Sequence, residues 1–293
     1  MAHWKDMETG VLEKQYSPSC WSLRMSSEEV IDAHVKVTAS GTQKSKGLVQ
    51  TLLNVPYGTK EGENLDVYLP SNPCGALPLL VYIHGGYWQF FSKEESGFMA
   101  APLVAKGIAV AAIDYDIAPK GHMDLMVSQV RRSIAFIVQQ YSHFSGLYLC
   151  GHSAGAHLAA MALSTDWSEY GVRPDIKGVF LVSGIYDLLP ITRTYVNQEL
   201  QMTEEVALRN SPLQHLQEVK PANENCRIAV VVAENDSPEF HRQSREYFQG
   251  LQKLGLNISF AMVDNTDHFD VIEGLCEENN VLTKMLLDLI LEA

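Results

Sequence analysis

Residues 147–157 read Leu147-Tyr-Leu-Cys-Gly151-His-Ser153-Ala-Gly155-Ala-His157. An apolar run leads into Gly-x-Ser-x-Gly, and a run rich in alanine and leucine follows, which predicts a strand, a sharp turn and a helix. Such a turn strains the backbone of Ser153 and presents its hydroxyl at the N-terminus of the helix. Gly151 and Gly155 fit because a side chain at either position would collide with a neighbouring strand or helix. The segment therefore indicates a serine nucleophile at the edge of an α/β sheet.

Short apolar runs before and after this segment indicate a sheet that is buried on both faces. The expected strands are 47–55, 64–69, 79–83, 108–113, 147–150, 178–182, 228–233 and 258–263. Helical patterns occupy 26–37, 94–106, 124–141, 154–163, 239–254 and 277–291. Because buried strands alternate with helices, the connections should be right-handed crossovers. The predicted fold class is α/β, an α/β-hydrolase fold with helices on both faces of a mostly parallel central sheet.

Two regions fall outside the alternation of strands and helices. Residues 1–46 are polar and are expected to form an N-terminal segment with the short helix at 26–37. Residues 186–225 contain three prolines and no clear strand, and they are too long for a simple loop. We expect them to form a small helical insertion or cap on an α/β-hydrolase domain that spans residues 47–293.

A serine nucleophile needs a general base and an acid that orients the base. In this fold the chain order is serine, then aspartate or glutamate, then histidine. The expected strand at 228–233 is followed by Glu234-Asn-Asp236, so the acid should lie here. Asp236 is the preferred candidate and Glu234 is its rival. His268 follows the last expected strand and is the candidate base.

Other acids and histidines have simpler expected roles. Asp187 follows an earlier strand and is a third possibility for the acid, but capping a helix in the insertion is the preferred interpretation. His152 and His157 lie beside the sharp turn at Ser153, which is called the nucleophile elbow below. Both are expected to be packed and hydrogen-bonded rather than catalytic. His241 lies on an expected helix and is assigned to the surface.

A second motif, His84-Gly85-Gly86-Tyr87-Trp88, follows the expected strand at 79–83. Glycine lets backbone N–H groups turn toward a developing negative charge, where a Cβ would obstruct them. Gly85 and Gly86 are therefore the expected oxyanion donors, together with the N–H of Ala154. Tyr87 and Trp88 are placed to crowd the acyl side of Ser153. The alternative is that both rings only pack under the cap.

The composition limits the partners of the chain. Its 22 lysines and arginines against 35 aspartates and glutamates give a net charge of −13, which argues against nucleic acid and anionic membranes. The five cysteines form no Cys-x-x-Cys pair, so neither a disulfide framework nor a zinc or other metal site is expected. No run of about 18 apolar residues and no apolar leader occurs. We expect a cytoplasmic protein, with the nucleus as a further location and no membrane partner.

Four motifs together resemble the kynurenine formamidase (arylformamidase) family, in the hormone-sensitive-lipase-like branch of the α/β hydrolases. They occupy residues 84–88, 151–158, 183–188 and 267–273. The first two motifs are shared by many esterases. The Tyr87-Trp88 continuation and the His268-Phe-Asp tail are more specific to this family. The similarity runs from about Tyr16 to the C-terminus. The resemblance implies hydrolysis of N-formyl-L-kynurenine to L-kynurenine and formate, in tryptophan catabolism, without a cofactor.

The chemistry of the motifs agrees with this resemblance. A formyl group is the smallest acyl group, and an aryl amine leaves more readily than an alkyl amine. The expected partner is a small aromatic formamide substrate, and a homodimer is left open. Two other interpretations remain: a general carboxylesterase of the same branch, and a non-catalytic binding protein that retains the hydrolase fold.

Overall fold

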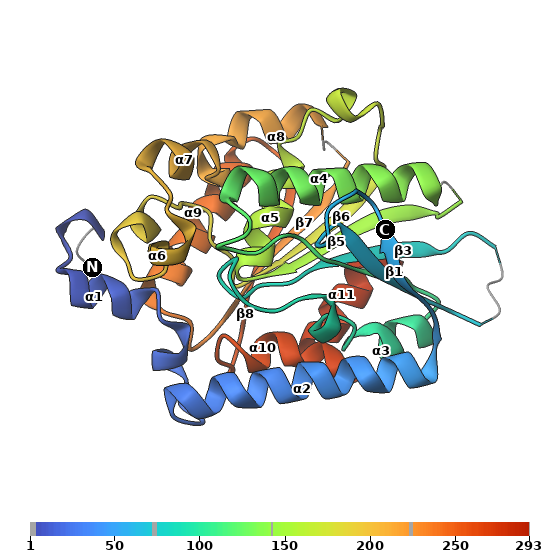
Figure 1. Ribbon diagram of the computed structural model, residues 1–293, viewed down its shortest axis with the longest axis horizontal. Coiled ribbons are helices and arrows are strands. Elements are labelled where there is room, and N and C mark those ends of the chain that lie inside the picture. The colour runs from blue at the N-terminus through green and yellow to red at the C-terminus, as the bar shows by residue number, and fades with distance from the viewer. Residues whose placement is uncertain (1–3, 72–74, 142, 223–224, 293) are drawn as a thin grey trace.

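The computed structural model describes residues 4–71, 75–141, 143–222 and 225–292. Its centre is an eight-stranded sheet with the strand order β1-β2-β4-β3-β5-β6-β7-β8 (Figure 1). The strands are β1 (Gln50–Pro56), β2 (Asn64–Leu69), β3 (Pro78–Ile83), β4 (Ala109–Ile113), β5 (Gly146–His152), β6 (Ile176–Val182), β7 (Arg227–Ala233) and β8 (Asn257–Val263). Pairs β1–β2 and β2–β4 are antiparallel, and all the other pairs are parallel. This mostly parallel sheet confirms the predicted fold class.

Helices cover both faces of the sheet (Figure 1). The α-helices are α1 (Thr9–Gln15), α2 (Ser27–Leu48), α3 (Ala100–Ala105), α4 (Met123–Gln140), α5 (Ala154–Leu163), α6 (Asn197–Leu200), α7 (Glu204–Arg209), α8 (Leu216–Ala222), α9 (Pro238–Lys253), α10 (Asp270–Glu273) and α11 (Val281–Leu291). The 3₁₀ helices are η1 (Trp4–Asp6), η2 (Pro18–Trp21), η3 (Lys93–Glu95), η4 (Trp167–Tyr170), η5 (Pro190–Arg193), η6 (Pro212–Gln214) and η7 (Gly274–Cys276).

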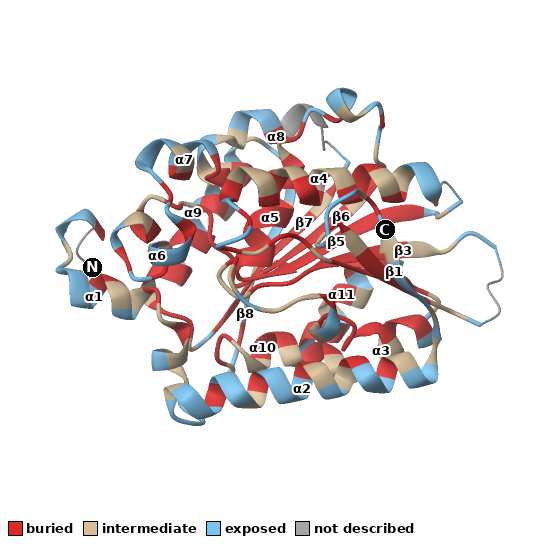
Figure 2. Ribbon diagram, viewed as in Figure 1, coloured by how far each residue is buried: buried red, intermediate tan, exposed pale blue. Residues whose placement is uncertain are grey.

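The alternation of side chains along β3 shows how the two layers form. Leu79, Val81 and Ile83 face a core shared with α4, α5 and α9, whereas Leu80 and Tyr82 face a second core shared with α3 and α11. Successive strand residues point to opposite faces, so a continuous apolar run supplies both cores. Figure 2 shows the strands buried between the helices. The sheet is thus fixed on both sides, and its edge at the carboxyl ends of the strands carries the loops described below.

Helix α2 is much longer than the predicted 26–37, and it ends at Leu48, so the strand expected from residue 47 begins only at Gln50. Its N-terminus has a capping box between Ser26 and Glu29. The buried side of its second half consists of small polar residues, namely Thr38, Thr42 and Ser45. A hydrophobic pattern therefore stops at Val37 although the helix continues.

The helix expected over 94–106 is two helices, η3 and α3, separated by residues 96–99. A Cβ at Gly97 would collide with the hydroxyl of Tyr68, and Ser96 bonds back to the carbonyl of Ser92 at 2.6 Å. This interruption brings η3 to the site. The C-terminal helix begins later than expected, because Asn280 caps α11 through the N–H of Leu282.

Between β6 and β7 the described residues form the short helices η5, α6, α7, η6 and α8, in the range where an insertion is expected. Within the described ranges, no helix has the length and apolar character needed to cross a membrane. Cys20, Cys150, Cys226 and Cys276 are free thiols, and Cys150 and Cys226 are buried. Cys74 lies outside the described residues.

Candidate active site

Ser153 lies between the end of β5 at His152 and the start of α5 at Ala154. Its backbone has φ 55° and ψ −119°, a conformation that residues with a Cβ rarely adopt. A hydrogen bond from its N–H to the carbonyl of Val182 on β6 holds it there at 2.9 Å. Because Ala154 is the first residue of α5, its N–H has no partner within the helix. The structure thus has the strained turn that the sequence predicts.

Two glycines allow this turn to pack closely. A Cβ on Gly151 would collide with the carbonyl oxygen of Gly155 in α5, and a Cβ on Gly155 would collide with the carbonyl oxygen of Ile83 on β3. In both cases the obstacle is backbone, which cannot move aside as a side chain can. The predicted reason for both glycines is confirmed.

Asp236 and His268 come together at the carboxyl ends of the strands. Asp236 lies in the turn between β7 and α9, and His268 lies in the loop after β8. The ring Nδ1 of His268 is 2.7 Å from Oδ1 of Asp236, and the two residues are 3% and 4% exposed. A carboxylate accepts, so Nδ1 is the donor, and this bond selects the tautomer of the neutral ring in which Nε2 carries the lone pair. His268 and Ser153 both line the same cavity.

The second oxygen of Asp236 is held as well. The hydroxyl of Ser183 donates to Oδ2 at 2.5 Å, and the N–H of Ala233 donates to it at 2.9 Å. Ser183 follows β6, is fully buried, and has φ 48°. Sequence reasoning did not find Ser183; the available signal was its place directly after a buried strand beside β7. These contacts fix the orientation of the carboxylate.

The other candidates for the acid point elsewhere. Glu234 is exposed and accepts from the N–H of Asn265 at 2.6 Å. Asp187 accepts from the N–H of Leu189 at 3.0 Å, but it does not cap η5 as expected, because the N-cap of that helix is Leu189. His241 bonds to the carbonyl of Glu234 at 3.2 Å. Of the three acids considered from the sequence, the structure brings Asp236 to His268.

Gly85 lies against the elbow, and Gly86 follows it in the loop after β3. A Cβ on Gly85 would be 2.7 Å from the carbonyl oxygen of His152 and 3.1 Å from Cβ of Ser153. Gly86 has φ 88°, which favours glycine. The ring of His84 donates from Nδ1 to the carbonyl of Gly85 at 2.9 Å. Since the N–H of Gly86 is trans to that carbonyl, it points away from His84, and it has no acceptor in the described part of the chain.

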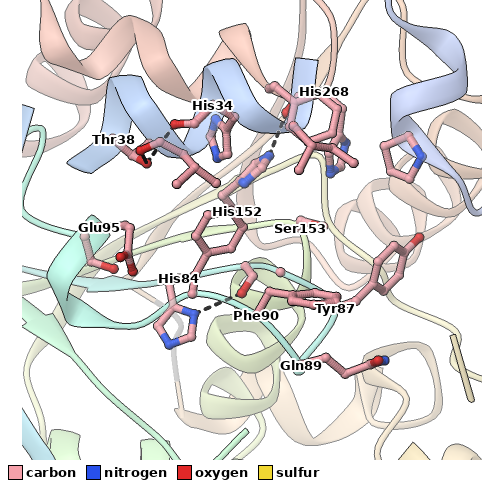
Figure 3. A pocket seen from close by; sticks show the side chains of 18 of the residues that line it. His34, Thr38, His84, Tyr87, Gln89, Phe90, Glu95, His152, Ser153 and His268 are labelled. Carbon is pink, nitrogen blue, oxygen red and sulfur yellow. Dashed lines mark hydrogen bonds between the residues drawn. The ribbon is translucent and has the colours of Figure 1, made fainter. Parts of the chain in front are cut away.

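A cavity of about 660 Å³ opens beside Ser153 (Figure 3). Its wall comes from the elbow, the loop after β3, η3, the loop after β8, residues Tyr195 and Val196, and the N-terminal segment. Helix α2 contributes Ile31, His34, Val35 and Thr38, and η2 contributes Pro18 and Ser19. Sequence reasoning assigned no site residue to this segment, because nothing local marks a helix as the wall of a distant cavity.

Tyr87 and Trp88 have different positions. Tyr87 lines the cavity, and its hydroxyl donates to the carbonyl of Tyr16 at 2.8 Å. Trp88 is fully buried outside the cavity wall, and its Nε1–H donates to Nδ1 of His157 at 3.1 Å. His157 in turn donates to the carbonyl of Asn210 at 2.7 Å. The structure brings only Tyr87 to the cavity, and His157 has the buried, hydrogen-bonded role expected for it.

His152 ties the elbow to the loop of the candidate base. Its Nε2–H donates to the carbonyl of His268 at 2.8 Å. Burial lowers the pKa of His152 well below its usual value, and the neighbouring His268 and His34 lower it further. His152 is therefore neutral near pH 7. His34 bonds to Glu273 at 2.8 Å, which joins α2 to the same cluster.

The eight-stranded sheet and the strained serine between β5 and α5 define the class of protein, the α/β hydrolases. The solved structure of EstE1, a carboxylesterase cloned from a metagenomic library, agrees in fold: its TM-score is 0.69 at 16% identity, over 92% of this chain and 99% of that chain. The BD-FAE family model matches residues 65–240.

Two curated relatives match nearly the whole chain. Kynurenine formamidase of Danio rerio is 62% identical over 290 residues, 99% of each chain, and kynurenine formamidase of Salmo salar is 62% identical over 288 residues, 98% of each chain. This chain belongs to the kynurenine formamidase family and is an enzyme, a hydrolase.

Proposed function

We propose that this enzyme hydrolyses the formamide bond of N-formyl-L-kynurenine to give L-kynurenine and formate. One observation carries the proposal beyond family membership: the hydrogen bond of 2.7 Å between His268 Nδ1 and Asp236 Oδ1, at the cavity that also holds Ser153. A neutral histidine oriented by a buried carboxylate is the base that a serine nucleophile requires. The relatives named kynurenine formamidase support the choice of substrate.

In the first half of the reaction, Nε2 of His268 takes the proton of the Ser153 hydroxyl as its oxygen attacks the formyl carbon. The C–O bond forms and the carbonyl electron pair moves to the oxygen, giving a tetrahedral oxyanion. When the C–N bond breaks, the nitrogen takes that proton from His268 and leaves as the aryl amine. Asp236 holds the imidazole and stabilises its charged form. A formyl ester on Ser153 remains.

In the second half, a water molecule gives a proton to His268 and attacks the formyl ester. The serine oxygen leaves, recovers the proton from His268, and formate is released. Both tetrahedral states carry a negative oxygen, which the N–H groups of Gly85, Gly86 and Ala154 are proposed to bind. The bond from His84 to the carbonyl of Gly85 supports this assignment, since it orients the Gly86 N–H.

The test is turnover of N-formyl-L-kynurenine by the purified enzyme, measured as formate and L-kynurenine in equal amounts. Replacing Ser153→Ala should lower kcat by about 10⁴ or more. His268→Ala should cost about as much, and the double variant should be little worse, because the residues act as one unit. A wild-type enzyme that turns over a butyryl ester but no aryl formamide would instead identify a general carboxylesterase.

A further inference from the structure

The described residues of the cavity wall carry a single permanent charge. Among the described residues that line it, Glu95 is the one carboxylate, and none is a lysine or an arginine. The other lining residues are apolar, neutral polar or histidine. Glu95 ends η3, and Figure 3 shows it on the side of the cavity away from His268. A group bound between Ser153 and this wall would therefore meet a negative charge at one end.

Glu95 has no cationic partner among the residues that the structure describes. Its Oε2 accepts from the N–H and the hydroxyl of Ser92, both at 3.0 Å, in a capping box. Within the described residues, no lysine, arginine or histidine nitrogen lies within 4.0 Å of the carboxylate. Its neighbour Glu94, by contrast, pairs with both Lys46 and Lys93 at 2.6 Å. Capping uses one oxygen of Glu95 and leaves the other free for a ligand.

A partly buried carboxylate is stabilised by a cation, because charges interact more strongly where the wall excludes water. We propose that Glu95 binds the α-ammonium group of the substrate and thereby selects aryl formamides that carry a primary ammonium. This inference rests on the proposed function and adds to it a residue for the amino-acid end of the substrate. An aryl formamide that carries only a carboxylate would meet a like charge at Glu95 and should bind worse.

The test uses Glu95→Gln, which removes the charge but keeps the cap, since glutamine also serves at the third position of a capping box. Glu94→Gln is the matched control: it makes the same change of charge one residue away, at a side chain that does not line the cavity. Each variant is assayed with an aryl acetate as the reporter substrate, and the inhibition constant Ki is measured for two competitors. One is L-kynurenine, and the other is its analogue without the α-amino group.

We expect Glu95→Gln to raise the Ki of L-kynurenine about tenfold or more, which corresponds to one charge-assisted hydrogen bond. The Ki of the analogue without the α-amino group should not rise, and should fall if anything, because Glu95→Gln removes the like charge that its carboxylate meets. Glu94→Gln should change neither Ki. Added salt should weaken the binding of L-kynurenine to the wild type more than to Glu95→Gln.

Equal rises for both competitors would mean that Glu95 acts only through the loop, and the proposal would be overturned. An unchanged Ki for L-kynurenine would overturn it as well. Turnover of N-formyl-L-kynurenine by the wild type judges the proposed function separately. If formamide turnover is absent, that function fails, and the Ki comparison still decides whether Glu95 holds an ammonium group.

Discussion

Asp236 has both carboxylate oxygens engaged, one by His268 and the other by Ser183 and Ala233. The charge and the geometry of this residue are therefore separable. An asparagine at this position keeps the shape of the side chain but removes the charge that would stabilise a protonated His268, and it favours the wrong tautomer of the ring.

For this reason Asp236→Asn should lower kcat by roughly 10³–10⁴-fold with little change in KM. Glu234→Gln should cost less than about threefold, because Glu234 is exposed and contacts the Asn265 backbone. Steady-state kinetics on both variants, with melting temperatures as a control for folding, provide the comparison. A larger loss for Glu234→Gln would transfer the role of the acid to Glu234.

Tyr87 and Trp88 are adjacent in sequence but differ in what each ring contacts. Trp88→Phe removes the donor to His157 in a fully buried place, so the free energy of unfolding should fall by about 1–3 kcal/mol. The ratio of butyryl-ester to formamide activity should not change. Tyr87→Ala should raise that ratio, because each added methylene in a hydrophobic pocket is worth about 1–3 kcal/mol. A changed ratio in Trp88→Phe would show that its ring reaches the acyl group.

Helix α2 and the turn before it form one wall of the cavity and are tied to the loop of His268. Arg24 and Ser22 donate to Asp267 at 2.8 and 2.6 Å. Burial alone would raise the pKa of Asp267, but the hydrogen bonds from Arg24 and Ser22 hold it well below its usual value. The N-terminal segment therefore positions the residue next to the candidate base.

Arg24→Ala should lower the free energy of unfolding by roughly 1–3 kcal/mol, since it leaves the buried carboxylate of Asp267 without its cation. It should also lower kcat, because the loop that carries His268 loses an anchor. Arg209→Ala is the control, as it breaks a similar pair with Asp124 on the surface. Urea unfolding and kinetics of both variants test this. Equal effects of the two changes would mean that the pair of Arg24 and Asp267 contributes no more than an ion pair on the surface.

Over the whole molecule, the net charge of −13 and two buried neutral histidines shape the response to pH. Burial lowers the pKa of His157 from 6.5 to about 4, and it lowers that of His152 well below 6.5. The unfolded chain therefore binds protons that the folded protein does not between about pH 6.5 and pH 4. Asp270 acts in the opposite sense over part of this range, because burial raises its pKa to about 6.

The free energy of unfolding should thus fall as the pH is lowered from about 6.5 to about 4, by at most about 1.4 kcal/mol per pH unit for each histidine. Asp270 offsets part of this slope below about pH 6. Urea unfolding at several pH values measures the slope. His157→Gln should reduce the slope by the contribution of close to one proton, which is about 1.4 kcal/mol per pH unit. An identical slope in that variant would contradict the assignment of the proton uptake to His157.

The sequence by itself determined the sheet, the order of its strands along the chain, and the strained turn at Ser153. These features depend on local patterns: continuous apolar runs mark strands buried on both faces, and glycines mark places where backbone meets backbone. The place of Asp236 and His268 also followed from the sequence, because the carboxyl ends of parallel strands meet at one edge of the sheet. Cytoplasmic location and a homodimer stay predictions.

Only the tertiary structure decided which side chains share the cavity. The long α2, with Thr38, Thr42 and Ser45 on its buried side, carries no hydrophobic pattern, so neither its length nor its role as a wall could be read locally. Ser183 and Glu95 reach the site from separate elements, and no spacing along the chain encodes those approaches. Trp88 points away from the cavity because the backbone at Gly86, Tyr87 and Trp88 has positive φ throughout, a conformation that the packing of the loop selects rather than the residue types.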